Sequence, residues 1–160
     1  MKIYDTDPEV FGRTSTIKAQ RTKTEIDGVL AKFGIKDVLW HSDFQANDVF
    51  VVFKLPPEKF GNVEQALSIK LEPPRIWHKN KHGDEINWDA SMRNLFWYIQ
   101  THLSQAYVMQ SSKFTEFLPH ILTKDGSKVV DSIKRMYALP EYVEEEKQEP
   151  INITPEVAKE

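Results

Sequence analysis

The longest apolar pattern in the chain runs from Glu85 to Leu122. Proline and glycine are absent between Asp84 and Leu118, so nothing obliges a helix here to stop before about Tyr107 to Gln110. We therefore expect a long amphipathic helix on which the smaller elements pack. At helical spacing its apolar side chains fall on one face, namely Trp88, Met92, Leu95, Phe96, Ile99, Leu103 and Ala106.

Shorter patterns precede this helix. Residues 1–13 have no clear period and are expected to form an irregular arm, whereas residues 15–20 alternate between polar and apolar and predict a short strand with one wet face. Thr22 and Glu25 then form a capping-box pattern, which is typical of a helix start. The apolar residues that follow it repeat at helical spacing, and Gly34 stands where a helix C-terminus favours a left-handed residue.

Three more strands are predicted before the long helix. Residues 36–43 and 48–55 indicate a hairpin, and the run 49–53 is apolar on both faces, as in a central strand. Pro56-Pro57 ends that strand because proline cannot donate to the ladder. Alternation over residues 66–71 predicts the third strand, followed by a proline pair and a loop.

The C-terminal part predicts a short helical piece at 114–118, a turn at 124–126 and a last helix after Ser127. Residues 138–160 are rich in Glu, Pro and Lys and predict a flexible acidic tail. We thus expect one α+β domain over residues 1–137, in the order strand, helix, three strands and long helix. Its sheet would be covered by this long C-terminal helix.

Composition limits the chemistry and the location. The 160 residues include no cysteine, which excludes disulfides, thiolate metal sites and a thiol nucleophile. The first ten residues carry three acidic side chains and do not resemble a signal peptide, and no apolar run approaches a membrane span. We expect a cytoplasmic protein, in a host cell if viral, with no membrane partner.

The net charge of −3 is unevenly distributed. Residues 138–160 hold seven Glu and two Lys, a local charge of −5, so residues 1–137 carry a charge of +2. A slightly basic body with an acidic tail suits a nucleic-acid-binding protein whose tail competes for the cationic face or recruits host or phage proteins. A tail that only keeps the protein soluble is the alternative.

Four groups of residues, spread over about residues 15–135, have a familiar order. They are Thr24-Glu25-Ile26 through Phe33-Gly34, Val52-Phe53-Lys54-Leu55-Pro56, Met92-Arg93-Asn94-Leu95-Phe96, and Phe117-Leu118-Pro119-His120 with Asp125-Gly126. In this order the chain resembles a family of small uncharacterised phage and prophage proteins. The resemblance implies a viral or prophage origin and assigns no catalytic residue.

The segment Arg75–His82 is the main candidate for a functional surface. It places three basic side chains, two histidines and a tryptophan in eight residues. Cations attract phosphates and exposed aromatic rings stack on bases, so we expect a loop in which Arg75, Lys79 and Lys81 contact phosphates and Trp77 stacks. In the alternative interpretation, Ile76 and Trp77 enter the core and the charges only solvate a loop.

Four further cations are candidates for the same surface. Lys18, Arg21 and Lys23 form a second basic group, and Arg93 lies in the first turns of the long helix. Arg93 has a structural alternative, an ion pair with Asp89 one turn earlier.

Catalytic and metal-binding patterns are weak. His78 and His82 have the i, i+4 spacing of two metal ligands on a helix, but Gly83 and the polar surroundings indicate a loop. His41-Ser42-Asp43 is a hairpin end rather than a triad, because adjacent strand residues point to opposite faces. His102 and His120 are interpreted as packing residues.

We therefore predict a non-enzymatic protein that binds single-stranded nucleic acid, accessory to replication or recombination, with no cofactor and no metal. An oligomer is compatible with this prediction. The alternative is a protein–protein interaction module, such as a phage inhibitor of a host enzyme or an assembly subunit. A hydrolase with an unrecognised site is the third hypothesis.

Overall fold

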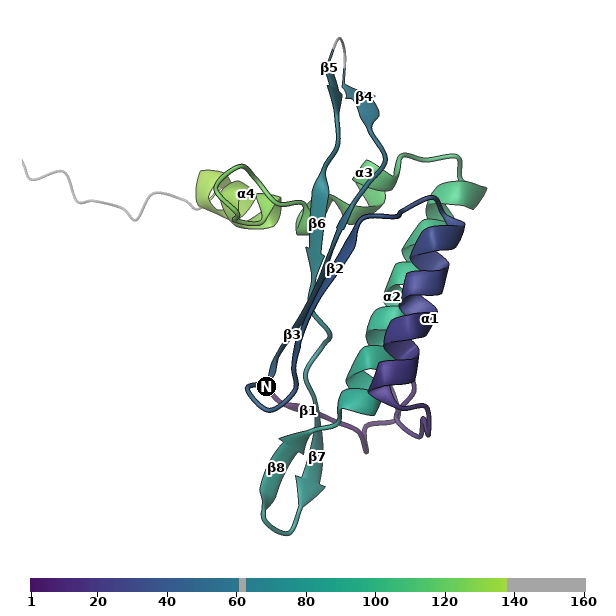
Figure 1. Cartoon of the computed structure of the whole chain (residues 1–160). Helices are drawn as coiled ribbons and strands as arrows, with labels where there is room; N and C mark the ends of the chain where they lie inside the picture. Colours follow the sequence, from purple (N-terminus) through teal and green to yellow (C-terminus); the bar gives the residue numbers. More distant parts are fainter. Residues whose placement is uncertain (61–62, 138–160) are drawn as a thin grey trace, which may run out of the picture.

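The computed structural model describes residues 1–60 and 63–137 of the chain (Figure 1). The predicted acidic tail, residues 138–160, lies outside the described residues. The elements follow one another as β1 (Ile3–Tyr4), α1 (Ala19–Lys32), β2 (Val38–Asp43), β3 (Asp48–Lys54), β4 (Glu58–Phe60), β5 (Val63–Gln65), β6 (Ser68–Leu71), β7 (Ile76–Asn80), β8 (Gly83–Ile86), α2 (Trp88–Val108), α3 (Lys113–Phe117), the 3₁₀ turn η1 (Leu118–His120) and α4 (Val129–Tyr137).

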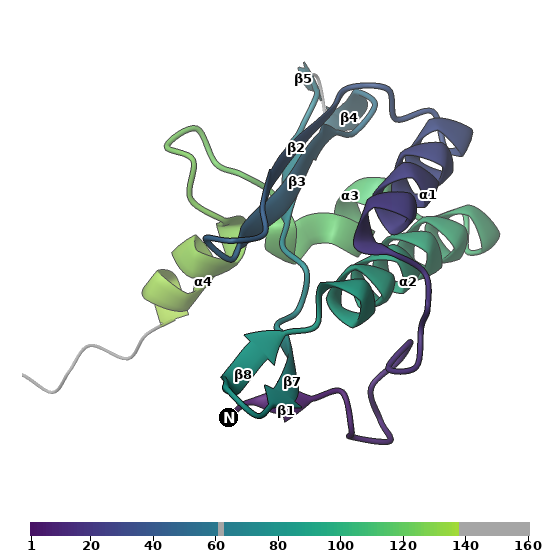
Figure 2. The same ribbon diagram turned by 60° about the horizontal axis from the view of Figure 1, so that its bottom comes forward.

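The chain forms a single small α+β domain, as predicted. Its main sheet is antiparallel in the order β2-β3-β6, and α1 and α2 lie together on one side of it (Figures 1 and 2). A second three-stranded sheet, β1-β7-β8, lies at the start of α2, and β4 and β5 form a separate two-stranded ribbon. Each of the three sheets contains one antiparallel hairpin between consecutive strands, namely β2–β3, β4–β5 or β7–β8.

The core forms between α2 and the main sheet. Ile99 and Leu103 of α2 are fully buried, as are Val51 and Phe53 of the central strand β3. Phe53 packs edge-on against Phe117 of α3, with ring centroids 5.6 Å apart. The predicted apolar face of the long helix and the central position of β3 are both confirmed.

The start of α1 corrects the prediction for residues 15–20. The helix begins at Ala19, and the side chain of Asp89 in α2 accepts a hydrogen bond from the Ala19 backbone N–H at 2.8 Å. Because this cap comes from another helix, no local sequence pattern signals it. The capping box is wrong too: Thr22 is buried inside the helix, and Glu25 pairs with Arg93.

The N-terminal arm and the segment 75–82 also differ from the prediction. Residues 3–4 form β1, which pairs in parallel with β7, and most of the expected loop is the β7–β8 hairpin. The expected loop before β6 contains β4 and β5. The long helix is not C-terminal, because α3, η1 and α4 follow it. These differences depend on pairing between segments, which single-segment periodicity does not show.

Other boundaries agree with the sequence patterns. Gly34, the residue after the C-cap Phe33 of α1, has a φ of 82°, the left-handed conformation expected at a helix end. The turn between β2 and β3 contains Asn47 with a φ of 55°, which asparagine tolerates better than most residues. No helix in the described ranges is long and apolar enough to cross a membrane.

We expect Ile99→Ala to lower the free energy of unfolding by about 2–5 kcal/mol, because it leaves a cavity beside a fully buried side chain. Gln105→Ala, at an exposed position of the same helix, should change it by less than about 0.5 kcal/mol. Urea unfolding followed by circular dichroism measures both. Equal effects of the two substitutions would contradict the buried position of Ile99.

The cap on α1 gives a second prediction. Asp89→Ala removes the acceptor of the Ala19 N–H and should lower the free energy of unfolding by about 1 kcal/mol. Asp89→Asn keeps an oxygen in the same place and should cost less. The same unfolding measurement compares the two variants, and an equal loss would show that the hydrogen bond to Ala19 contributes nothing.

Candidate nucleic-acid interface

The β7–β8 hairpin carries the predicted basic and aromatic residues on alternate sides. Ile76 is buried, and Trp77 and Lys79 share the opposite face because strand side chains alternate. Trp77 is half-buried and Lys79 is exposed. The interpretation in which both Ile76 and Trp77 enter the core is therefore correct for Ile76 and partly correct for Trp77.

Strand β1 brings the N-terminus onto this face. Ile3 is in register with Ile76 and Tyr4 with Trp77, so Tyr4 and Trp77 are neighbours on one side of a three-stranded ribbon (Figure 2). The backbone N–H of Asp5 donates to the Trp77 carbonyl at 2.9 Å and extends the pairing by one residue. Two segments more than seventy residues apart thus form one surface.

Each aromatic ring on this surface has a lysine beside it. The Lys2 ammonium is 4.4 Å from the centroid of the Trp77 ring, and the Lys79 ammonium is 4.9 Å from the centroid of the Tyr4 ring. Both distances are those of cation–π contacts. We call Lys2, Tyr4, Trp77 and Lys79 the basic–aromatic face.

Asp84 of β8 ties this face together. Its Oδ2 accepts hydrogen bonds from Lys2 Nζ and from the Tyr4 hydroxyl, both at 2.9 Å. These two bonds, the Lys2 bond first, hold the pKa of Asp84 below its usual value. The same bonds raise the pKa of Lys2 and of Tyr4. At neutral pH Lys2 is therefore an ammonium and Asp84 a carboxylate, and the two form an ion pair beside the rings.

The other side of the ribbon fixes β1 in place. The Asp5 carboxylate, only 9% exposed, contacts His78 Nδ1 at 2.7 Å and accepts a hydrogen bond from Asn87 Nδ2 at 2.8 Å. Asn87 also caps α2, because its Oδ1 accepts from the Ala90 N–H at 3.1 Å. The ribbon is therefore attached directly to the start of the core helix.

The remaining candidate cations lie in two places. Arg75 and Lys81 are exposed at the two ends of β7, next to the basic–aromatic face in sequence. Lys18 pairs with Asp89 at 3.3 Å, and the exposed Arg21 pairs with Glu25 at 3.5 Å. Lys23 lies 5.4 Å from the centroid of the Trp40 ring. Lys18 and Arg21 are thus paired with carboxylates of the two helices and Lys23 lies beside β2, so none of the three contributes to the basic–aromatic face.

Arg93 is a structural residue. Its side chain is 14% exposed, its NH1 binds Glu25, and its guanidinium lies 4.3 Å from the centroid of the Phe96 ring. The predicted pair with Asp89 is absent from the ion pairs of the described residues, because Asp89 turns to α1 instead. Gly12, with a φ of 64°, packs closely on Arg93, where an added Cβ would come within 2.8 Å of its Cγ.

Sequence reasoning missed Lys2, Tyr4 and Asp84. A signal for the first two was present, because Lys2-Ile3-Tyr4 alternates polar and apolar side chains. Three residues are too short to predict a strand without knowledge of a partner. Asp84 gave no signal, since its role depends entirely on the register between β7 and β8.

A second polar group lies between α2 and η1. The Tyr98 hydroxyl is 2.8 Å from His120 Nε2, beside a hollow of about 310 Å³ that both residues line with Asn94 and Glu72. Burial raises the pKa of Tyr98 and lowers that of His120, which favours the neutral form of both groups. His102 contacts Glu116 at 3.5 Å, so His102 and His120 both have polar partners within the packing.

The metal and triad patterns do not assemble in the described residues. His78 lies on β7 and its side chain contacts Asp5, whereas His82 lies in the turn between β7 and β8. His41 pairs with Asp48 across the β2–β3 hairpin at 3.0 Å, and the ion pairs of the described residues include none between His41 and Asp43. Within residues 1–60 and 63–137 no three His, Asp or Glu side chains form a metal-binding cluster.

The Asp84 contacts give a pH prediction. A carboxyl whose folded pKa is lowered stabilises the fold above its unfolded pKa of about 3.9 and loses that effect as pH falls through the folded pKa. The difference in unfolding free energy between the wild type and Asp84→Asn should therefore be constant near neutral pH and shrink below about pH 4. Urea unfolding at several pH values tests this, and a difference that does not change with pH would contradict it.

Comparison with known proteins gives no similarity to add to this geometry. No family model, no curated protein and no solved structure matches the chain at a significant level. Any functional assignment therefore depends on the residues and contacts described above.

Proposed function

We propose that the chain binds single-stranded nucleic acid through the basic–aromatic face, without catalysis. One observation carries this proposal: Tyr4 and Trp77 lie side by side with a lysine beside each ring. Backbone phosphates need cations, and bases need flat apolar rings on which to stack. This face offers both within one three-stranded ribbon.

Charge supports the proposal at the same place. Arg75 and Lys81 add two exposed cations at the ends of β7, whereas Asp84 is the carboxylate that binds within the face. Four cations near one ribbon can contact about four phosphates. Arg93 is removed from the proposed contacts, because its side chain is only 14% exposed and binds Glu25. Lys18, Arg21 and Lys23 are not part of the ribbon and are not counted among these four cations.

The cation–π contacts suggest how a strand would bind. Lys2 lies over Trp77 in the free protein, and a base that stacks on this ring would move the ammonium toward a phosphate. Lys79 lies over the Tyr4 ring in the same way, so a base that stacks on Tyr4 would likewise move the Lys79 ammonium toward a phosphate. Stacking needs bases that are not already stacked in a duplex, so the preferred ligand is single-stranded.

The proposal includes a role for the acidic segment of residues 138–160. This segment follows α4 in the sequence and has a charge of −5. In the proposal it competes with nucleic acid for the cations of the ribbon or recruits other proteins. An accessory role in single-strand handling, in a phage or its host, is consistent with such a protein.

A second candidate is a protein–protein interaction module. Tyr107, Val108 and Met109 at the end of α2 are 78%, 74% and 64% exposed, which is unusual for three consecutive apolar side chains. The two candidates differ in one simple property. Binding to nucleic acid weakens steeply with salt, whereas binding through an apolar surface does not.

Fluorescence anisotropy with a labelled oligothymidylate tests the proposed function. With about four phosphate contacts, affinity should fall about 50-fold between about 50 mM and about 200 mM salt. Lys79→Ala with Lys81→Ala should weaken binding and reduce the salt dependence by about half. Trp77→Leu should weaken binding at every salt concentration, because the loss of stacking costs about 1–3 kcal/mol.

The matched control is Lys32→Ala with Lys36→Ala, which removes the same charge. Lys32 is the last residue of α1 and Lys36 lies in the loop that follows it, and both are exposed (Figure 1). This control should bind almost like the wild type. Circular dichroism confirms that each variant folds. The proposal would be contradicted if no binding is seen at micromolar protein, or if the two double variants lose affinity equally.

A further inference from the structure

The outer side of α2 is unlike the rest of the protein surface in its charge. Residues 94–112 contain no Asp, Glu, Lys or Arg, although they include most of a helix that is exposed on one side. By contrast, α1 carries Arg21, Lys23, Asp27 and Lys32. A helix that faced only water would be expected to carry charges on its outer side.

Apolar side chains stand on this uncharged side at both ends. At one end Phe11 of the N-terminal arm and Trp97 are 64% and 41% exposed, with ring centroids 6.2 Å apart. At the other end are Tyr107, Val108 and Met109. Charged residues are depleted, and aromatic residues and Met enriched, in the cores of protein interfaces.

The stripe between the two ends is narrow and polar but uncharged. Trp97 and Val108 are separated by about three helical turns, so they lie on the same side about 16 Å apart. Thr101 is exposed and Ser104 is half-buried between them. Small side chains at these two positions allow another helix to approach closely.

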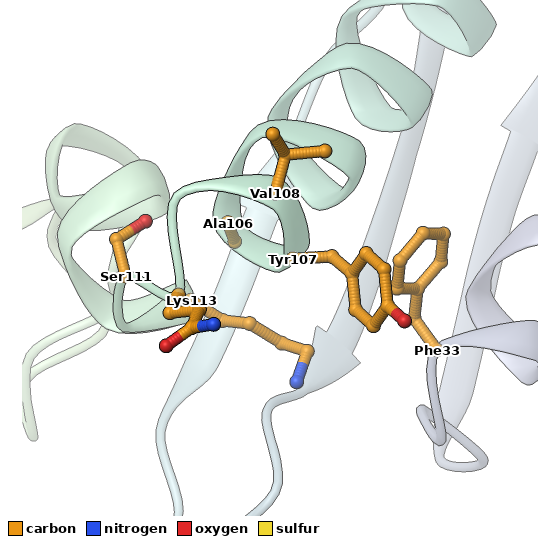
Figure 3. A pocket seen from close by; sticks show the side chains of 7 residues that line it. Phe33, Ala106, Tyr107, Val108, Ser111 and Lys113 are labelled. Carbon is orange, nitrogen blue, oxygen red and sulfur yellow. The ribbon is translucent and has the colours of Figure 1, made fainter.

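A hollow adjoins the Val108 end. It has a volume of about 530 Å³, and Figure 3 shows Tyr107 beside Phe33 of the α1 end along its wall. Val108 and Ala106 also line it, together with Gln110, Ser111 and Lys113, so its walls combine apolar and polar side chains. One end of the outer side of α2 therefore carries the raised Phe11–Trp97 pair, and the other end adjoins a hollow at the C-terminus of the helix.

From this arrangement we infer that α2 forms the interface of a homodimer, in which it pairs in antiparallel fashion with α2 of a second copy. A two-fold axis near Thr101 and Ser104 would place Trp97 of each copy at the Val108 end of the other. The raised end would then meet the hollowed end twice, which is the self-complementarity that a two-fold interface requires. An uncharged stripe also meets its own copy without repulsion between like charges.

Three exposed aromatic side chains supply about half of the area that such a dimer needs on each partner. At about 150–250 Å² per aromatic side chain, the exposed parts of Phe11, Trp97 and Tyr107 alone amount to roughly 300–450 Å². A standard interface buries about 800 Å² on each partner. Val108, Met109 and the central stripe contribute further area. The basic–aromatic face belongs to another part of the molecule, so a dimer would present two copies of it.

Analytical ultracentrifugation of the full chain at tens of micromolar tests the inference. The wild type should sediment at twice the chain mass of 18.6 kDa. Thr101→Glu would place two like charges at the two-fold axis and should raise the dimer dissociation constant at least about 100-fold. Thr24→Glu, at an exposed position of α1, is the control and should leave the dimer intact.

A mixing experiment identifies the face. Thr101→Glu and Thr101→Lys should each be monomeric alone, and an equal mixture should form a heterodimer because opposite charges then meet at the axis. A thermal unfolding scan checks that both variants are folded. A wild type that stays at the monomer mass, or a dimer that Thr101→Glu does not weaken, would overturn the inference. Binding of the monomer to a different protein through this face would overturn it as well.

Discussion

The burial of one side of α2 is the constraint on which the other contacts depend. Ile99 and Leu103 have no exposed surface, so the helix is held against the main sheet along its length. A helix held in this way also fixes whatever is attached to its start. Asn87 caps the helix, its N–H donates to the Ile76 carbonyl, and its side chain binds Asp5. The core therefore positions the ribbon through these contacts at the start of α2.

The same helix organises the N-terminal third of the chain. Asp89 caps α1, and Arg93 binds Glu25 in the middle of α1. These polar contacts set how α1 lies along α2, while the apolar side chains of both helices enter the core. Charged groups between the two helices are thus used for alignment. In α2 they lie in the first two turns, and residues 94–112 contain no Asp, Glu, Lys or Arg.

The features of the fold that the sequence predicts correctly are those whose contacts lie within one segment of the chain. The long helix, the central strand β3 and the helix end at Gly34 depend on patterns within one segment, and all three are confirmed. The start of α1 depends on Asp89, which lies seventy residues from Ala19, and was predicted wrongly. Long-range pairing of this kind has no local signature.

The candidate site shows the same division. The segment Arg75–His82 was identified from its cations and its tryptophan, because composition within eight residues is local information. The strand conformation of this segment was not predicted, because β7 forms by pairing with β8 and β1. Lys2 and Tyr4 were missed for that reason, although they supply half of the basic–aromatic face. Arg93 was assigned to the site because its partner Glu25 could not be seen from its neighbours in sequence.

Photocrosslinking is the sharpest test of nucleic-acid binding through the basic–aromatic face, because it reports which aromatic rings lie against bases. A single strand that contains 5-iodouracil is irradiated with the full-length protein, and the crosslinked peptide is mapped by mass spectrometry. We expect crosslinks at Tyr4 or Trp77, on the basic–aromatic face. Crosslinks confined to other aromatic side chains, such as Phe50 on the main sheet or Trp97 on α2, would contradict it.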